Sequence, residues 1–318
     1  MPGLALCLII AAAARYLSDY YGAPQMLFAL LIGIAFHFVI EEERFARGVD
    51  FAARKVLRFG VTLLGLRITF GEIASLGWEV ALLLIGGVAL TILFGIGGAS
   101  LLGRRAQFGA LTGGAVAICG ASAALAISAV LPRHDDSERN LIFTVIAVTT
   151  FSTIAMIVFP VIAGALGFDE RTTGLFLGGT IHDVAQVVGA GYSVSPDAGD
   201  VATIAKLFRV AMLVPAVIVI ALAFRAPGSG TAGGVRFPLF LIGFCACVVI
   251  NSLGVLPEAV RSGLEDLSGW CLVAAVAALG IKTSLKTLFT IGYQPVLMVL
   301  AETLFIAVWV AVGVSHFS

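Results

Sequence analysis

Charged residues are scarce in this chain of 318 residues, where Asp, Glu, Lys and Arg together make up 12%. Soluble domains carry roughly a quarter of such residues. The hydrophobic share is 60% and the mean hydropathy is +1.07, so the chain lacks the polar surface that a water-soluble protein needs. This scarcity excludes the soluble class and predicts a polytopic membrane protein. The formal net charge is zero, so nothing indicates a nucleic-acid partner.

The chain also lacks the spacings that mark metal, cofactor and catalytic sites. The motifs HExxH and GxSxG are missing, as are paired membrane aspartates of the GxGD kind. We therefore predict no metal, no cofactor and no enzymatic activity. The cysteines show no metal-ligand or paired secretory spacing, and most of them are expected to be small buried hydrophobes: Cys7, Cys119, Cys245, Cys247 and Cys271.

Long apolar runs are abundant instead. A spanning helix needs about 20 mostly apolar residues, so these runs predict an all-α membrane protein of about 10–11 transmembrane helices. They form one membrane-embedded domain over 1–318, in which 41–55 is the longest polar connection. The first run is short, which predicts a short or incomplete first helix. The expected spans are 4–17, 24–40, 54–70, 78–102, 107–131, 140–166, 174–194, 200–224, 235–252, 267–285 and 293–314.

The basic residues of the connections divide unequally between the two sides of the predicted membrane. The positive-inside rule then predicts a cytoplasmic N-terminus and an external C-terminus. One side carries Arg44, Arg47, Arg54, Lys55, Arg58, Arg104, Arg105, Arg171, Arg225, Arg236, Lys282 and Lys286; the other carries Arg15, Arg133, Arg139 and Arg261.

Two stretches of the chain resemble each other, LGLRITFGEIASLG (64–77) and LGIKTSLKTLFTIG (279–292). Leu-Gly pairs coincide, and Arg67 matches Lys282. A fainter match joins 30–38 to 240–248. In the predicted topology the matching helices cross in opposite directions, which indicates inverted repeats of about 24–166 and 171–314, typical of secondary transporters. The alternative is chance similarity between apolar helices.

Two segments are rich in small residues, 109–130 and 174–191. Glycine weakens a helix, and freed backbone groups at membrane depth must line a cavity or be buried. We expect two interrupted helices, crossing or re-entrant, whose N–H groups hold an anion. Tight helix packing through small residues is the alternative. The candidate substrate-binding residues are Gly113, Gly114, Cys119, Gly120, Ser122, Gly178, Gly179 and Thr180.

Ionisable residues in apolar surroundings complete the candidate site. His182, Asp183 and Gln186 have the spacing of one helix face, and Lys206 and Arg209 follow in the next apolar run. Because charges in a bilayer are costly, they are expected to pair or to face a cavity. Asp183 is expected to neutralise one cation and to leave the other for an anion. Snorkelling of the two cations to the interface is the alternative.

Further roles are assigned to the neighbouring ionisable residues. His182 and Asp183 are the candidate coupling residues, because a histidine titrates near neutral pH. Arg67 and Lys282 are secondary site candidates, with interface anchoring as the alternative.

GGTIHDVAQVVGAG (178–191), KLFRV (206–210), GAVAICGASAALA (114–126) and LLGLRI (63–68) together resemble the YeiH-type sulfate exporter family. The resemblance covers nearly the whole chain. It implies an inner-membrane carrier with inverted repeats, loosely similar to sodium/bile-acid symporters and cation/proton antiporters, which exports sulfate or a related oxyanion.

The predicted function is therefore secondary transport of a small inorganic or organic anion by alternating access. The expected partners are that anion, protons or sodium as coupling ion, the lipid bilayer and, as an option, a second copy in a homodimer. An anion channel and a sodium-coupled carrier of a small organic anion are the alternatives. A structural scaffold would not need four ionisable side chains inside the bilayer.

Overall fold

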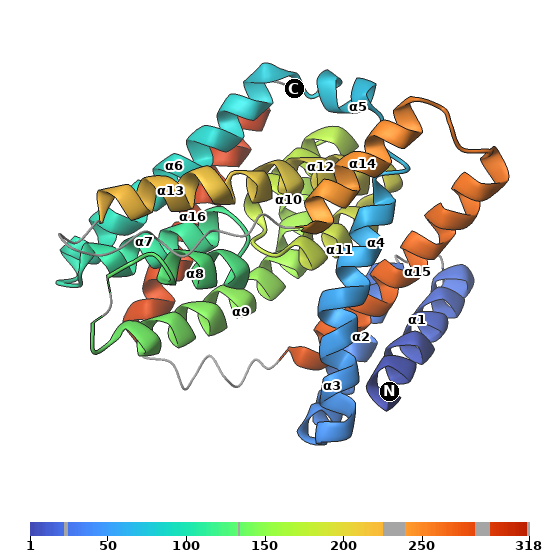
Figure 1. Ribbon diagram of the computed structural model, residues 1–318, viewed down its shortest axis with the longest axis horizontal. Helices are drawn as coiled ribbons and strands as arrows, with labels where there is room; N and C mark the ends of the chain where they lie inside the picture. The colour runs from blue at the N-terminus through green and yellow to red at the C-terminus, as the bar shows by residue number, and fades with distance from the viewer. Residues whose placement is uncertain (22–24, 133, 225–238, 284–292, 317–318) are drawn as a thin grey trace. The chain divides into compact units, whose positions relative to one another are not determined.

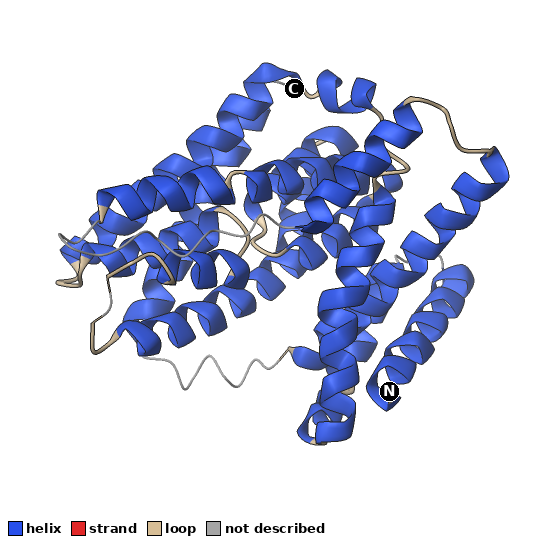
Figure 2. Ribbon diagram, viewed as in Figure 1, coloured by secondary structure: helices blue, strands red, loops and turns tan. Residues whose placement is uncertain are grey.

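The fold is known from a computed structural model that describes residues 1–21, 25–132, 134–224, 239–283 and 293–316. Helices dominate these residues, and Figure 2 draws no strand over them. The all-α prediction is thereby confirmed. Arg133, Arg225, Arg236 and Lys286, which entered the orientation prediction, lie outside the described residues.

Within the described residues, six helices are long and apolar enough to cross a membrane. In lipid, a helix satisfies its own backbone hydrogen bonds, so apolar runs of this length fold this way. The finer count of eleven spans stays a prediction. The six are Pro2–Tyr21, Gly77–Leu101, Ser137–Ala165, Pro196–Ala223, Glu258–Lys282 and Val296–Ser315, and shorter apolar helices cover Gln25–Ala35, Val184–Val194 and Leu239–Ser252.

The chain divides into two compact units, each assembled from separate segments. Unit 1 comprises Met1–Gly77, Ala185–Val201 and Pro238–Ser284. Its α-helices are labelled in Figure 1. They are α1 (Pro2–Tyr21), α2 (Gln25–Ala35), α3 (Glu43–Phe51), α4 (Leu57–Leu64), α5 (Phe70–Ser75), most of α11 (Val184–Val194), the start of α12 (Pro196–Ala211), α14 (Leu239–Ser252) and α15 (Glu258–Lys282), and the short helices η1 (His37–Glu41) and η2 (Ala52–Val56) precede and follow α3.

Unit 2 comprises Trp78–Val184, Ala202–Phe237 and Leu285–Ser318. The helices of unit 2 are α6 (Gly77–Leu101), α7 (Ala106–Ala117), α8 (Ala121–Ser128), α9 (Ser137–Ala165), α10 (Glu170–Thr180), the rest of α12, α13 (Leu213–Ala223) and α16 (Tyr293–Ser315). Helix α12 ends at Ala211 before α13 begins. Pro215, in α13, has no N–H to bond the Ala211 carbonyl.

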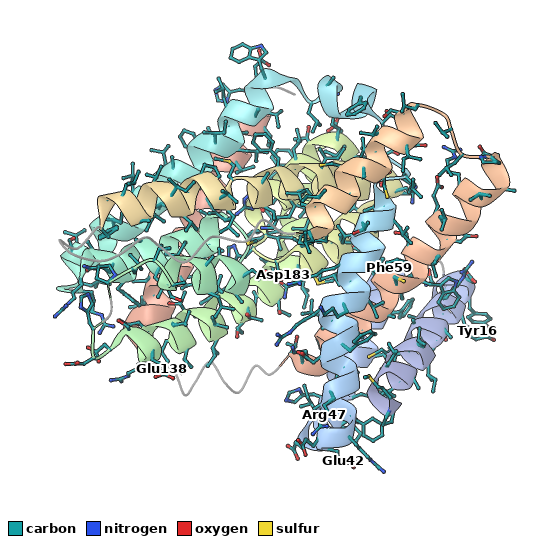
Figure 3. All side chains as sticks on the ribbon, viewed as in Figure 1. Tyr16, Glu42, Arg47, Phe59, Glu138 and Asp183 are labelled. Carbon is teal, nitrogen blue, oxygen red and sulfur yellow. The ribbon has the colours of Figure 1, made fainter. Side chains whose placement is uncertain are left out.

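One prediction near the N-terminus differs from the structure. The first helix is not short, since α1 has 20 residues. The polar connection 41–55 is largely helical, running through α3 and η2 into α4. Its charges pair along the exposed helix surface, as in the i,i+4 pair of Glu43 with Arg47 at 3.0 Å, so polarity alone did not indicate a loop. Figure 3 shows Phe59 of α4 and Tyr16 of α1 as exposed side chains.

Within unit 1, two pairs of helices pack through glycines at related positions. A Cβ on Gly33 of α2 would lie 2.4 Å from the Ala277 carbonyl oxygen of α15, close to Gly280. A Cβ on Gly65, next to α4, would lie 2.5 Å from the Phe244 carbonyl oxygen of α14. Only glycine allows backbones to approach this closely. Gly65 and Gly280 are matching positions of the predicted repeat, which itself stays a prediction.

Candidate functional site

Helix boundaries fall in the middle of both glycine-rich segments. In the first, α7 ends at Ala117 and α8 begins at Ala121. Gly120 has φ 63° and ψ −128°, a backbone conformation that side chains with a Cβ rarely adopt. In the second, α10 ends at Thr180, and Ile181 is extended with φ −62° and ψ 140° before α11 begins at Val184. That each pair forms one interrupted membrane span stays a prediction.

The two helix breaks, 118–120 and 181–183, lie side by side in unit 2. A Cβ on Gly120 would lie 3.8 Å from the His182 Cβ. Ile118 and Ile181 are both buried. Two helix C-termini, those of α7 and α10, therefore meet in the buried interior of this unit.

Lys206 and Arg209, both fully buried on α12, donate to the carbonyls at these helix ends. The Lys206 Nζ donates to the Ile118 oxygen at 2.5 Å and to the Ile181 oxygen at 2.9 Å. The Arg209 guanidinium donates to four carbonyl oxygens: Ala117 at 2.8 Å, Val116 at 2.9 Å, Gly178 at 3.0 Å and Ile181 at 3.2 Å.

The physical reason for this arrangement lies in the ends of the helices. The last carbonyls of a helix have no partner inside it and carry a partial negative charge. Two buried cations satisfy these carbonyls and balance that charge. We expected backbone N–H groups of 113–122 and 178–182 to hold an anion, but at the breaks the carbonyls of 116–118, Gly178 and Ile181 accept hydrogen bonds from Lys206 and Arg209. Snorkelling is wrong for both residues, because neither reaches the surface.

His182 and Asp183 lie between helices rather than on one. The expected common helix face with Gln186 is wrong, because α11 begins only at Val184. The His182 Nε2 lies 3.0 Å from the Thr303 hydroxyl of α16. The Asp183 N–H donates to the Ser152 hydroxyl of α9 at 3.1 Å. Asp183 is partly exposed, whereas His182 and Gln186 are buried.

Four of the predicted glycines make close packing contacts, the alternative that the sequence left open. Any side chain there would overlap a neighbour, so these positions let helices approach. A Cβ would meet Thr91 O at 2.8 Å from Gly113, Ile127 Cδ1 at 2.2 Å from Gly114, Ala202 O at 2.3 Å from Gly178, and Val310 Cγ1 at 2.8 Å from Gly179.

The other predicted residues of the two segments differ in how accessible they are. The Thr180 hydroxyl donates to the Phe176 carbonyl at 2.6 Å, and Cys119 is buried. Ser122, in the first turn of α8, is exposed. Ser122 and Asp183 are therefore the members of this group that are at least partly exposed.

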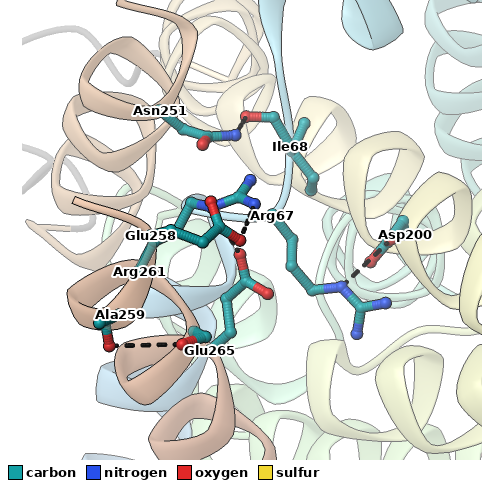
Figure 4. A network of polar contacts seen from close by, with 9 residues as sticks. Arg67, Ile68, Asp200, Asn251, Glu258, Ala259, Arg261 and Glu265 are labelled. Atoms are coloured by element: carbon teal, nitrogen blue, oxygen red, sulfur yellow. Dashed lines mark hydrogen bonds and ion pairs between the residues drawn. The ribbon is translucent and has the colours of Figure 1, made fainter. Parts of the chain in front are cut away.

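The secondary candidates Arg67 and Lys282 both have acidic partners in unit 1. The Arg67 Nε lies 3.6 Å from an Asp200 carboxylate oxygen (Figure 4), and its guanidinium lies 5.7 Å from the centre of the Tyr192 ring. The Lys282 Nζ lies 2.6 Å from an Asp50 carboxylate oxygen. Asp50 is shared with Arg54, whose Nε lies 3.0 Å from the same carboxylate oxygen. An anion site at these two residues stays a prediction.

Sequence reasoning missed several buried polar residues of unit 2. Glu302 and Thr303 on α16 and Thr112 on α7 are buried, and Thr112 Oγ1 lies 2.6 Å from Glu302 Oε1. The signal was present, because Glu302 is a carboxylate within the apolar run Val296–Ser315 and ionisable residues within spans mark functional sites by default.

Comparisons with known proteins place the chain among bacterial membrane proteins. A family model described as "Conserved hypothetical protein 698" matches residues 2–299. The UPF0324 membrane protein TauZ of Paracoccus denitrificans is 54% identical over 317 residues, which cover 98% of this chain and 94% of that protein. A UPF0324 membrane protein of Chlorobaculum tepidum is 55% identical over 313 residues, covering 97% and 87%. A third, from Caulobacter vibrioides, is 37% identical over 313 residues, covering 96% and 66%.

No solved structure matches the chain. None of the names of these three relatives states a substrate, so the sulfate-exporter resemblance stays a prediction. The relatives and the six long apolar helices together identify a multi-pass membrane protein.

Proposed function

The chain belongs to the family described as Conserved hypothetical protein 698, and we propose that it is a secondary active transporter that moves a small anion across the bacterial cytoplasmic membrane. The substrate that its sequence resemblance implies is sulfate or a related oxyanion, moved outward by alternating access. The N-terminus lies in the cytoplasm under this proposal. The observation that carries it is the fully buried pair Lys206 and Arg209 beneath two touching helix breaks.

The charges around this pair favour an anion. Two full positive charges face two helix C-termini, each equivalent to roughly half a negative charge. About one positive charge is left over by this count, and Asp183 is the partly exposed carboxylate beside it. When Asp183 takes up a proton, an anion can supply the missing negative charge. Anion binding and proton binding are then linked at one site.

The same contacts favour protons over sodium as the coupling ion. A sodium site at the breaks would use the carbonyl oxygens of non-helical backbone. The carbonyls of Ile118 and Ile181 already accept hydrogen bonds from Lys206, and that of Ile181 also accepts one from Arg209. The titratable side chains His182 and Asp183 are the residues that we propose for proton transfer.

Contacts within unit 1 support the repeat on which alternating access depends. His37 Nδ1, past the end of α2, lies 2.7 Å from the carbonyl oxygen of Ile281 at the end of α15. Asn251, near the end of α14, donates to the carbonyl oxygen of Ile68 beyond the end of α4 at 3.2 Å. The first contact joins α2 to α15 and the second joins α14 to α4. These are equivalent pairs under the predicted repeat, because 30–38 matches 240–248 and 64–77 matches 279–292. Inverted repeats related in this way are the usual basis of alternating access.

Thermal unfolding of the purified protein with added anions tests the proposal. Sulfate, sulfite, thiosulfate, phosphate, chloride and small carboxylates would be screened at two pH values. A ligand at 100 times its Kd stabilises the native state by about 2.7 kcal/mol. We expect one oxyanion to raise the Tm of the wild type, more strongly at the lower pH, because protonation of Asp183 exposes the positive charge.

The matched variants are Lys206→Gln and Lys55→Gln. Lys55 is an exposed lysine of η2 in unit 1, so its variant should respond to the anion as the wild type does, while Lys206→Gln should not. Exchange of labelled anion in liposomes then separates a carrier from a channel, since only a carrier is accelerated by unlabelled anion on the opposite side. Equal responses in both variants would contradict an anion site at Lys206.

A further inference from the structure

Glu302 occupies an unusual position for a carboxylate. It is the one acidic or basic residue of α16, within the apolar stretch Val296–Ser315, and its side chain is fully buried. Burying a carboxylate in an apolar interior is costly unless the group is paired, hydrogen-bonded or neutral. Neither the anion site nor its coupling residues use this group.

Glycines make the space that the Glu302 carboxyl fills. A Cβ on Gly95 of α6 would lie 2.6 Å from Glu302 Oε1 and 2.5 Å from the Gly109 carbonyl oxygen of α7. The carboxyl therefore lies where α6 and α7 cross at close range. A side chain on Gly95 would displace it.

Thr112 can satisfy Glu302 in either protonation state. Its hydroxyl lies 2.6 Å from Glu302 Oε1 and can also donate to the carbonyl oxygens of Phe108 at 3.2 Å or Gly109 at 3.4 Å. An ionised Glu302 accepts a hydrogen bond from Thr112. A neutral Glu302 donates to Thr112, whose own hydrogen then turns to Phe108.

Fixed cations are missing around this carboxyl in the part of the chain that the structure describes. Ion pairs within 4.0 Å do not include Glu302 there, and Glu302 Oε2 has no hydrogen-bond partner among the same residues. The helices around α16 carry acidic or basic residues only near their first turns: Glu79 on α6, Arg105 before α7, Glu138 and Arg139 on α9, and Glu170 and Arg171 on α10. No neighbour therefore fixes the charge of Glu302.

The carboxyl is linked to the helix breaks on two sides. Thr303, the next residue, contacts His182 at 3.0 Å. Thr112 lies on α7, little more than one turn before Ala117, whose carbonyl accepts from Arg209. A change of hydrogen bonding at Glu302 can therefore reach the break at 118–120 through α7 and the break at 181–183 through α16.

We propose that Glu302 is a second proton-binding site, separate from His182 and Asp183, which is protonated in one state of the transport cycle and ionised in another. A proton from water on one side forms the O–H bond of the carboxylic acid, and the same bond breaks when the proton leaves on the other side. Thr112 is the hydrogen-bond partner in both states. The role in coupling rests on the proposed transport function, whereas the proton binding does not.

Infrared difference spectroscopy of the lipid-reconstituted protein at increasing pH measures this protonation directly. We expect a carbonyl band of a buried carboxylic acid that decreases as the pH rises. The band should be missing in Glu302→Gln and kept in Glu79→Gln, which removes an exposed carboxylate of α6. A band that keeps its intensity over the pH range in which the protein is folded would overturn the proposal, as would a band that persists in Glu302→Gln.

If Glu302→Gln does not fold, Thr112→Val can assign the carbonyl band to Glu302 instead. Removing the hydroxyl must move the carbonyl frequency and the midpoint of the titration, and an unmoved band would also overturn the proposal. In liposomes, Glu302→Gln should keep anion exchange and lose the acceleration by a pH gradient; unchanged acceleration contradicts the coupling role. Lack of anion binding by the wild type contradicts the proposed function alone, because the titration of Glu302 is measured without anion.

Discussion

The same two residue types occur in very different surroundings in the two units. In unit 1, Arg67 and Lys282 have side chains 38% and 31% exposed, and each has an aspartate partner. In unit 2, Lys206 and Arg209 are 0% exposed and donate to main-chain carbonyls at helix ends. Arg67 and Lys282 form ordinary ion pairs, whereas Lys206 and Arg209 satisfy carbonyls that have no partner inside their helices.

The ion pairs of unit 1 only stabilise the fold. The buried cations of unit 2 stabilise it and also give their surroundings a positive electrostatic potential. An exposed ion pair is locally neutral, is screened by salt and contributes roughly 0–1 kcal/mol. A buried cation facing carbonyls satisfies several acceptors together, and its full charge meets only the partial charges of the helix ends. The structural role of Lys206 and Arg209 and their proposed anion role therefore have the same origin.

Arg209→Met should have the largest effect on stability. It leaves the carbonyls of Val116, Ala117 and Gly178 without this donor in a buried place, and breaking a buried charged contact costs about 3–5 kcal/mol. Arg67→Met should cost less than about 1 kcal/mol. Thermal unfolding in detergent would measure both, with a Tm decrease of roughly 10 °C for the first and about 2 °C for the second.

Arg209→Lys sharpens the same measurement. It keeps the charge but has three donors in place of the planar guanidinium fork, so its Tm should lie between the wild type and Arg209→Met. If Arg209→Met unfolds at the same temperature as Arg67→Met, the carbonyl contacts do not carry the stability assigned to them here.

The amino-acid sequence predicts a large part of this arrangement. Glycines beside polar residues in apolar runs indicated both places where helices end, near Gly120 and His182. The prediction of these helix ends succeeds because it depends on local backbone propensity. For Lys206 and Arg209 the sequence indicated that they would pair or face a cavity, with snorkelling as the alternative; the structure shows them buried against carbonyls.

Other features depend on contacts between distant segments and could not be read from local patterns. Whether carbonyls or N–H groups meet Lys206 is decided by which helix ends pack against α12. The close glycine contacts, such as Gly178 against Ala202, depend on helix crossings. Glu302 could have been noticed as an isolated charge, but its partner Thr112 is 190 residues away in sequence.

Gly120→Ala tests the backbone of the break itself. Gly120 has φ 63° and ψ −128°, a combination that costs residues other than glycine roughly 1–3 kcal/mol. Gly254 of unit 1 also has a positive φ of 63°, with nothing within 4 Å of a Cβ placed there, and Gly254→Ala is the matched control. We expect a Tm decrease of about 5 °C for Gly120→Ala. The anion response should also weaken only in this variant, because the Ile118 carbonyl moves relative to Lys206. An unchanged Tm in Gly120→Ala together with an unaltered anion response would show that the break tolerates a side chain.

Asp169→Asn should have the smallest effect of these substitutions. Asp169 lies at the N-terminal end of α10, and Arg209 donates to carbonyls at the C-terminal end of the same helix. Asp169 begins α10 and accepts from the Thr172 N–H at 2.7 Å; hydrogen bonds from Thr172, side chain first, lower the pKa of Asp169 below its ordinary value of 3.8. Because the pKa is lower in the folded state, the charged form stabilises the fold above the unfolded pKa, and this stability is lost as the pH falls through the folded pKa. Asparagine caps a helix as well as aspartate does. The difference in stability between the wild type and Asp169→Asn therefore reports the charge alone, which at an exposed helix end contributes about 0.3 kcal/mol. The Tm difference between wild type and variant should therefore be small at pH 7 and vanish well below pH 3.8. A difference that grows with acid would mean that the carboxylate, unlike the buried cations at the other end of α10, does not stabilise the helix through its charge.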